Sequence, residues 1–353
     1  MSKILAISTG GLGDTVLFSP VLKALHKSYP EAQIELLVAN SLAKEAYSYA
    51  KEVSRVAFAN FNRLSPSYLK ATALIPFALS AYLNGTYDKC YFATGLNPAL
   101  AKIMKNSGII HEIFCAPIVP AYPTDLDCNL ELARRIDESA SKNDIFIPET
   151  NEGEIEAKDI LEKHNMSVET DNLVAVYPST ELSHRPRWAL SNIIKVVKLI
   201  RNSGFKGKSV VVGSQREGQE WDTIDKDNIV DANLAGKLSI LGSASLLKKC
   251  SLAIANDGGL MHVAAAVKSP LVAIMANTPL SYRPHGKNVK IIHSKHTCCN
   301  GLYPKRPSKC KNARCTEDIT VKEVFHASKE ILDKTLGGYR SHESQLRIDD
   351  YLN

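Results

Sequence analysis

The sequence predicts an α/β protein built from two doubly wound, parallel-sheet domains. In the first half of the chain, short apolar runs typical of strands alternate with segments whose apolar residues recur at helical spacing. This alternation is typical of a parallel sheet covered by helices on both faces, and the second half repeats it. The length of 353 residues also exceeds the size at which one hydrophobic core usually keeps growing. We therefore expect one domain over residues 1–165, a second over residues 166–335 and a polar tail over residues 336–353.

The individual elements follow from the same periodicities. The first half predicts strands over residues 3–8, 32–38, 53–59 and 88–93, and helices over residues 15–30, 41–50, 67–84 and 96–106. The second half predicts strands over residues 172–178, 208–213, 251–257 and 270–276, and helices over residues 190–203, 216–225, 239–249 and 260–267. Residues 144–171 lack sustained apolar alternation, so we expect a linker there with one surface helix.

Composition indicates a folded protein that is not exported. Hydrophobic residues make up 44% of the chain and charged residues 23%. The opening "MSKILAISTGGLGD" has too short an apolar run for a signal peptide, so the eight cysteines indicate reduced thiols and a cytoplasmic location. The longest apolar stretch, residues 71–83, is shorter than the roughly 20 residues of a membrane span and contains Pro76. We expect a buried helix there, with interfacial membrane contact as the alternative.

The net charge of +6 comes from the second half of the chain. Residues 1–150 carry equal numbers of bases and acids, whereas no acid occurs between Asp257 and Glu317 and bases recur throughout that stretch. A segment with only positive charges raises the local concentration of anions, although a solvated basic face is an alternative explanation. Aromatic residues for base stacking are sparse here and no recognition motif is present, so we do not expect nucleic acid as a partner.

The stretch "STGGLGDT" follows the first expected strand and precedes a helix. In an open parallel sheet, ligands bind beyond the carboxyl ends of the strands, where free N–H groups of helix N-termini favour anions. Gly10, Gly11 and Gly13 allow a tight turn and a close approach to a ligand, but their spacing fits neither the dinucleotide fingerprint nor a phosphate-binding loop. Asp14 at the helix start has two interpretations: a helix N-cap, or a carboxylate at an inter-domain cleft that accepts a proton from an incoming hydroxyl.

The stretch "ANDGGLMH" has the same form in the second half. Gly258 and Gly259 leave the N-terminus of the following helix open, and His262 in its first turn would lie beside an anion bound there. A diphosphate leaving group suits this position, because N–H dipoles and a histidine stabilise the charge that builds on it. In the alternative, Asp257 caps the helix and His262 packs in a partly buried position.

A third stretch, "YPSTELSHRPRW", follows the first expected strand of the second domain. It supplies Ser179, Thr180, Arg185 and Arg187, side chains suited to phosphate oxygens. The two arginines could equally be surface charge. Their place at the carboxyl end of a strand favours contact with a ligand.

Together, several segments resemble a known family. They are "GLGDTVLFSPVLKALHKSYP", "NLAGKLSILGSASLLKKCSLAIANDGGLMHVAAAVKSPLVAIM", "TPLSYRPHG" and the late cysteines. In this order they are similar to glycosyltransferase family nine, the ADP-heptose:lipopolysaccharide heptosyltransferases, over most of residues 1–335. The resemblance implies a GT-B architecture in which two Rossmann-like domains face a central cleft. It implies an acceptor held by residues 1–165 and a nucleotide-sugar held by residues 166–335.

The resemblance also implies roles for individual residues. It makes Asp14, the acid of the "GD" motif, the general base. It places a basic residue before a tryptophan, here Arg187 before Trp188, on the donor side. The element at the donor diphosphate maps to Asp257, Gly259 and His262.

Three positions depart from the family pattern. Members usually carry Pro-Gly where this chain has Pro178 and Ser179, and often lysine where it has Arg185 or Arg187. After the strand over residues 270–276 a glycine is common, whereas Asn277 stands here. These positions face the donor, so they bear on the sugar and the nucleobase.

Two groups of residues resemble metal sites. Asp125 and Asp127 form a D-x-D arrangement of the kind that holds a divalent cation, but they lie just before a helix, so we expect capping. Four late cysteines could form a metal site that His293 or His296 completes, but they lack a Cys-x-x-Cys knuckle, so we expect reduced thiols. These cysteines are Cys298, Cys299, Cys310 and Cys315.

The function that these residues predict is an inverting, metal-independent sugar transfer that needs no cofactor. Asp14 takes the proton of an acceptor hydroxyl, while Gly258, Gly259, His262 and Arg187 stabilise the departing nucleoside diphosphate. The implied donor is ADP-heptose, and the implied acceptor is a lipid-linked core glycan reached by peripheral contact with the inner face of the cytoplasmic membrane. Two alternatives stay open: a nucleotide-binding protein without transfer, and a nucleotide-sugar epimerase on the same architecture.

Overall fold

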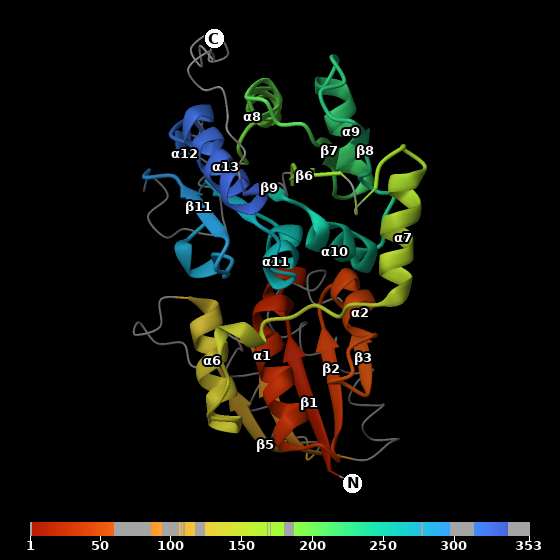
Figure 1. Cartoon of the computed structure of the whole chain (residues 1–353). Coiled ribbons are helices and arrows are strands. Elements are labelled where there is room, and N and C mark those ends of the chain that lie inside the picture. The colour runs from red at the N-terminus through yellow and green to blue at the C-terminus, as the bar shows by residue number, and fades with distance from the viewer. Residues whose placement is uncertain are drawn as a thin grey trace. The chain divides into compact units, whose positions relative to one another are not determined.

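The protein consists of two compact units, Met1–Pro148 and Glu149–Asn353, in the computed structural model (Figure 1). Each unit contains one parallel β-sheet with helices packed on it, so the predicted fold class is confirmed. The helix expected over residues 67–84, and nearly all of that expected over residues 96–106, lie outside the described residues. The structure describes residues 2–59, 86–93, 106, 108, 110–116, 124–167, 169, 171–179, 187–276, 278–296 and 314–337.

The sheet of the first unit has the strand order β3-β2-β1-β4-β5, and its strands are parallel. β1 lies at the centre and is buried almost throughout, which explains its near-continuous apolar sequence. Strands β1 to β4 match the predicted ones. β5 was not predicted, because its sequence "IHEIFC" mixes charged with apolar residues at an exposed edge of the sheet. The bounds are β1 Lys3–Ser8, β2 Gln33–Val38, β3 Arg55–Phe58, β4 Tyr87–Phe92 and β5 Ile110–Cys115.

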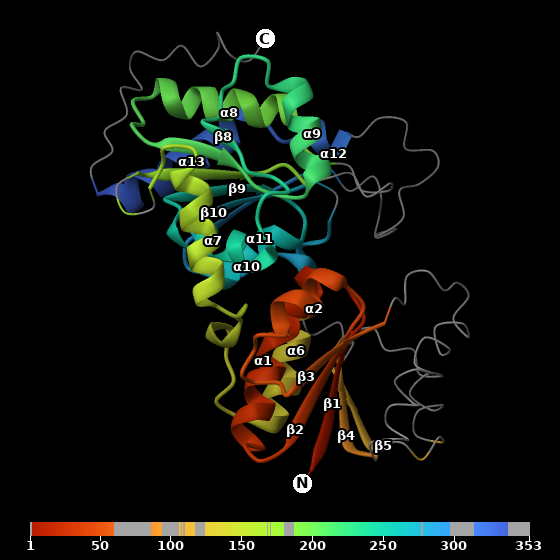
Figure 2. The same ribbon diagram turned by 90° about the vertical axis from the view of Figure 1, so that its right-hand side faces the viewer.

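Two long helices lie side by side on one face of this sheet, α1 and α6 (Figure 2). The buried amide of Asn129 on α6 donates a hydrogen bond to the carbonyl oxygen of Leu17 on α1, at 3.1 Å. α6 begins at Asp125, with Thr124 as its N-cap, so the D-x-D residues lie inside the first helical turn rather than before it. The bounds are α1 Leu12–Ser28, α2 Ser41–Tyr47, α6 Asp125–Ile136 and a 3-10 turn Lys142–Asp144.

The sheet of the second unit has the order β11-β10-β9-β6-β7-β8 and is also parallel. From β6 the chain first builds outward through β7 and β8, and then returns to the other side of β6 with β9, β10 and β11. The strand order therefore reverses between β6 and β9. The bounds are β6 Leu173–Tyr177, β7 Lys208–Val211, β8 Ala232–Asn233, β9 Leu252–Asn256, β10 Leu271–Met275 and β11 Val289–His293.

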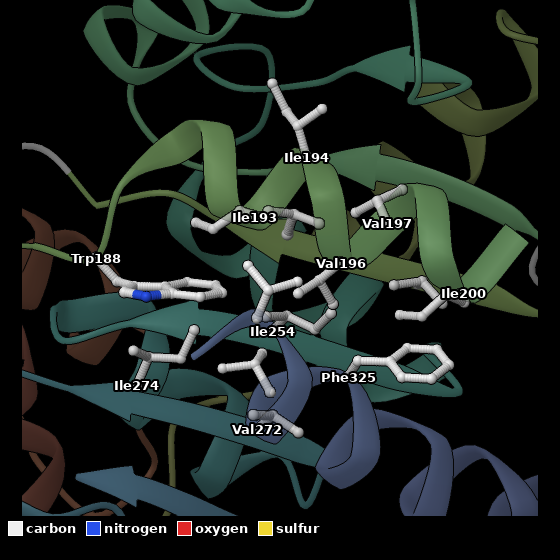
Figure 3. Close-up of a cluster of buried hydrophobic side chains, with 14 of the residues drawn as sticks. Trp188, Ile193, Ile194, Val196, Val197, Ile200, Ile254, Val272, Ile274 and Phe325 are labelled. Carbon is white, nitrogen blue, oxygen red and sulfur yellow. The ribbon is translucent and has the colours of Figure 1, made fainter. Parts of the chain in front are cut away.

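Helices cover both faces of this second sheet, with α8 and α13 on one face and α10 and α11 on the other (Figure 2). Ile193, Val196 and Ile200 of α8, at helical spacing, point toward strand residues and Phe325 of α13, and Trp188 lies at one end of this cluster (Figure 3). The indole nitrogen of Trp188 donates to a carbonyl oxygen at 2.8 Å, which satisfies its polar atom in the core. The bounds are α8 Leu190–Asn202, α9 Gln215–Ile224, α10 Ile240–Lys249, α11 Gly259–Ala266, a 3-10 turn Leu280–Tyr282, α12 Arg314–Glu317 and α13 Val321–Leu336.

Helix α7, Asn151–Glu162, packs on α10 and belongs to the second unit. The carboxylate of Glu156 accepts hydrogen bonds from the backbone N–H and the hydroxyl of Ser239, the N-cap of α10. Gly153 allows close contact, because a Cβ there would lie 2.9 Å from the carbonyl carbon and oxygen of Leu241. Because of these contacts the two units divide after Pro148, before α7. The sequence had predicted a boundary after residue 165, on the other side of this helix.

The substitution Gly153→Ala should lower the free energy of unfolding of the second unit by about 1–2 kcal/mol. The overlap with the Leu241 backbone costs about 1–3 kcal/mol, more than the gain of up to about 1 kcal/mol in helix propensity. Urea unfolding followed by tryptophan fluorescence measures this, since both tryptophans, Trp188 and Trp221, lie in the second unit. The exposed neighbour Glu154→Ala is the control. Equal stability of the two variants would contradict this account of α7.

Candidate functional site

The reversal of strand order between β6 and β9 is the place where an open parallel sheet binds its ligands. The chain leaves β6 through Pro178 and Ser179, and Ser179 adopts a left-handed backbone conformation with φ of 54°. This conformation is costly for a residue with a side chain and favours glycine. It explains why the glycine of the family's Pro-Gly pattern suits this position, where the present chain has serine instead. The Ser179 hydroxyl donates a hydrogen bond to the backbone carbonyl oxygen of Asp257 at 2.8 Å, which ties the two loops together.

Asn256, the last residue of β9, joins the same two loops by buried hydrogen bonds. Its buried side-chain amide donates to the carbonyl oxygens of Pro178, at 2.7 Å, and of Trp188, at 3.0 Å. Its side-chain oxygen accepts from the backbone N–H of Trp188 at 3.3 Å. Sequence analysis did not single out Asn256, although it stands inside the quoted motif, because a polar residue at a strand end is more often a turn residue than a clamp.

Asp257 holds a fixed position at the end of β9. Its backbone N–H donates to the carbonyl oxygen of Ile274 on β10, and its carboxylate accepts a hydrogen bond from the buried hydroxyl of Thr278. The ring nitrogen Nε2 of His293 is 3.1 Å from the carbonyl oxygen of Thr278, so β11 supports the same loop. Asp257 does not cap α11, whose N-cap is Gly258, and this interpretation was wrong. Its carboxylate instead faces the loop after β10.

Gly258 lets the start of α11 approach β6 closely. A Cβ at this position would lie 2.6 Å from the hydroxyl oxygen of Tyr177 and 3.0 Å from that of Ser179. The N-cap of α11 is Gly258, which has no side chain to cap the helix, so the N–H groups of the first turn suit an anionic partner. His262 lies at the end of this first turn and is buried.

Arg187 contributes a guanidinium group beside this loop. One terminal nitrogen donates to the carbonyl oxygen of Ser179 at 2.6 Å, and the other donates to the carboxylate of Glu220 on α9 at 2.5 Å. Arg187 is thus fixed at one end by the backbone and at the other by a partly exposed ion pair. Glu220 was not predicted, because it comes from a helix surface distant in sequence.

Tyr177, the last residue of β6, supports the loops as a neutral phenol. Burial, and next the nearby carboxylate of Glu217, raise the pKa of Tyr177 well above its ordinary value. Glu217 is itself buried at the start of α9, where its carboxylate accepts the backbone N–H of Ser214 at 2.5 Å. Neither residue was named by sequence analysis.

In the first unit, Asp14 lies at the carboxyl end of β1, in the first turn of α1. The N-cap of this helix is Gly11, and the carboxylate of Asp14, three residues on, accepts the backbone N–H of Gly11 at 2.6 Å. Asp14 is therefore not the N-cap, and that interpretation of the sequence was wrong. Its carboxylate nevertheless binds the backbone at the start of the helix. Gly10 leaves room for this carboxylate, since a Cβ there would lie 2.2 Å from its oxygen. Gly13, buried in the same turn, is the second residue of α1.

The structure describes the first of the two candidate metal groups and part of the second. Asp127 is engaged by Lys142 at 3.0 Å and by the hydroxyl of Thr124 at 2.5 Å, as expected of a structural carboxylate. Among the described residues, no group of three or more metal-binding side chains comes together. Cys315 is buried in the core beside α13. The remaining predicted residues, Thr180, Arg185, Cys298, Cys299 and Cys310, lie outside the described part of the chain.

Residues 123–313 match the family model described as "Glycosyltransferase family 9 (heptosyltransferase)". This match covers more than half of the chain. The chain belongs to glycosyltransferase family 9. The family that the sequence predicts is therefore confirmed.

Relatives and solved structures agree with this membership. The chain is 28% identical over 117 residues to lipooligosaccharide heptosyltransferase 2 of Haemophilus influenzae, an alignment that covers 32% of this chain and spans a third of that relative's length, 33%. It is 23% identical over 310 residues to lipopolysaccharide heptosyltransferase 2 of Escherichia coli K12, covering 80% of this chain and 85% of that one. The crystal structure of a family 9 glycosyl transferase from Veillonella parvula superposes with a TM-score of 0.76 at 16% identity, over 94% of this chain and 98% of that one. The similarity to the Veillonella parvula structure shows that the two proteins share a fold.

Ser179 offers a test of the donor-side loop in this family 9 protein. We expect Ser179→Gly to be more stable than Ser179→Ala by about 1 kcal/mol, because both lose the hydrogen bond to Asp257 but only glycine relieves the left-handed backbone. Urea unfolding followed by tryptophan fluorescence measures the difference. If Ser179→Ala is at least as stable as Ser179→Gly, the conformation assigned to this turn is wrong.

Proposed function

We propose that the protein transfers a heptose from ADP-heptose to a hydroxyl of a lipopolysaccharide core or related glycan. The observation that carries this proposal is the set of contacts at the reversal of strand order, where Ser179, Asp257 and the open first turn of α11 lie together. Such a place suits the diphosphate of a nucleotide-sugar. Membership of family 9 and the names of the heptosyltransferase relatives support heptose as the sugar.

The residues of the second unit would hold the donor and stabilise its leaving group. The first turn of α11 at Gly258 and Gly259 directs N–H dipoles toward the diphosphate, and His262 and Arg187 add hydrogen-bond donors. As the bond from the anomeric carbon to the diphosphate oxygen breaks, its electron pair goes to that oxygen. We propose that these groups stabilise the charge without a metal ion. Asp127, one candidate ligand for such an ion, is already engaged by Lys142.

Asp14 would act as the general base in the first unit. Its carboxylate takes the proton of the acceptor hydroxyl while that oxygen attacks the anomeric carbon, so the reaction is a single displacement with inversion. The backbone N–H of Gly11 holds the carboxylate in place. This proposal requires that the carboxyl edges of the two sheets share the substrates during transfer, with water excluded from the donor.

We also propose that the acceptor is lipid-linked and that the protein contacts the inner face of the cytoplasmic membrane peripherally. The stretch from Asp257 to Glu317, which carries bases and no acid in between, supports contact with anionic groups. None of the described helices combines the length and the apolar character that a membrane span requires.

The substitution Asp14→Asn tests the base. We expect kcat for transfer to fall by at least about 100-fold, because general base catalysis is worth about that much, while the Kd of ADP stays within about twofold. Product analysis with ADP-heptose and a truncated core acceptor gives the rate, and calorimetry gives the Kd. Near-normal transfer would remove Asp14 from the mechanism, and donor turnover without acceptor would favour an epimerase.

A matched pair of glycine variants tests the position of the same carboxylate. In Gly10→Ala the new Cβ would lie 2.2 Å from the carboxylate oxygen of Asp14 and displace it, whereas in Gly11→Ala the nearest contact is an ordinary 3.6 Å. We expect kcat to fall at least about tenfold in Gly10→Ala and to stay within about threefold in Gly11→Ala, because small displacements of a reacting group are costly. Similar rates for the two variants would show that the position of Asp14 does not matter.

A further inference from the structure

Helices α1 and α6 of the first unit run in the same direction. The side chain of Asn129 on α6 donates to the carbonyl oxygen of Leu17 on α1 at 3.1 Å. Toward the other end, the hydroxyl of Ser28 donates to the carbonyl oxygen of Ile136 at 3.0 Å. Because residue numbers rise along both helices from the first hydrogen bond to the second, the two N-termini lie at the same end.

This arrangement brings a second carboxyl group to the level of Asp14. Asp14 precedes Leu17 by three residues and Asp125 precedes Asn129 by four, so a rise of about 1.5 Å per residue puts both about 5 Å beyond the bond between the helices. Both side chains are partly buried. Asp125, which sequence analysis treated as a capping residue, thus stands beside the proposed base.

The surroundings of the two acids on α6 differ. Burial, and after it the negative charge of Asp14, raise the pKa of Asp125 to about 6. Asp127, two residues on, faces Lys142 of the following 3-10 turn instead. On α1, Lys23 extends to Asp144 at 4.0 Å and Lys27 to Asp137 at 2.7 Å. In the described part of the unit, Asp14 is the charged group that acts on Asp125.

We propose that Asp125 is a positioning residue for the general base: its ionised carboxylate makes transfer of the acceptor proton to Asp14 more favourable. This inference rests on the proposed function. When both groups are ionised they repel each other, and the proton that leaves the acceptor hydroxyl for the carboxylate of Asp14 relieves that repulsion. The acceptor oxygen forms its bond to the anomeric carbon in the same step, and the diphosphate oxygen keeps the electron pair of the bond that breaks. Once Asp125 is protonated, the repulsion and its benefit are gone.

The pH profile of kcat tests this. In the unaltered protein, kcat should rise about three- to tenfold through a step centred near pH 6, as Asp125 loses its proton. In Asp125→Asn the step should be absent, and kcat at pH 7.5 should fall to the level of the unaltered protein below the step, with the KM of both substrates within about twofold. The control Asp127→Asn should keep the step. A step that persists in Asp125→Asn, or an unchanged kcat at pH 7.5, would overturn the proposal.

A second measurement does not depend on activity. Carboxyl ¹³C NMR of aspartate-labelled protein should show Asp125 titrating near pH 6, and at lower pH in Asp14→Asn, because a neutral side chain then replaces the neighbouring charge. An unchanged titration would refute the pairing of the two carboxyl groups.

The two proposals can fail separately. If Asp14→Asn transfers normally, the base assignment fails, and the role of Asp125 fails with it. If Asp14→Asn abolishes transfer while Asp125→Asn leaves kcat and the step unchanged, only the role of Asp125 is lost. In the double variant, Asp125→Asn should have no effect of its own on the remaining rate, since it acts through Asp14.

Discussion

The buried side chain of Asn256 is the interaction on which the second unit's ligand edge depends. Its amide binds the backbone at both ends of the segment between Pro178 and Trp188, and it does so at the point where the strand order reverses. Loss of this group would leave buried backbone groups unpaired, at about 1–3 kcal/mol each. The same clamp couples the loop to the core, because Trp188 is also the large residue at the end of the cluster between α8 and the sheet (Figure 3).

Glycines at the two ligand edges serve a purpose that their sequence context only partly reveals. The sequence suggests tight turns and close approach to a ligand. In the structure, the φ of Gly258 is 166°, which is close to 180° and therefore an extended backbone that any residue can adopt. Neither Gly10 nor Gly258 has the left-handed backbone that favours glycine. What each needs is the absence of a Cβ, because the chain's own side chains fill that space: Asp14 at Gly10, and Tyr177 at Gly258. Ser179, by contrast, does carry a positive φ.

The sequence predicts the buried parts of this protein better than its edges. Central strands such as β1 and β9 are buried almost throughout and so are nearly continuous apolar runs, which periodicity detects. The edge strands β5 and β11 are partly exposed, and their mixed sequences resemble loops. Helix α13 has a strong start signal in Thr320 and Glu323, which form a capping box, and attention to that signal would have found it.

The candidate site residues also differ in how well the sequence predicts them. Asp14 and Asp257 are visible because each stands beside glycines between a strand and a helix, a local pattern that sequence displays. The contact of Glu220 and the proposed role of Asp125 are not visible in the sequence, because both depend on helices that meet only in the folded chain. No local pattern distinguishes Asp125 from Asp127, two residues apart in one helical turn. What separates them is the neighbour that each meets: Asp127 meets Lys142 of the following 3-10 turn, whereas the packing of α6 on α1 brings Asp125 to the carboxylate of Asp14.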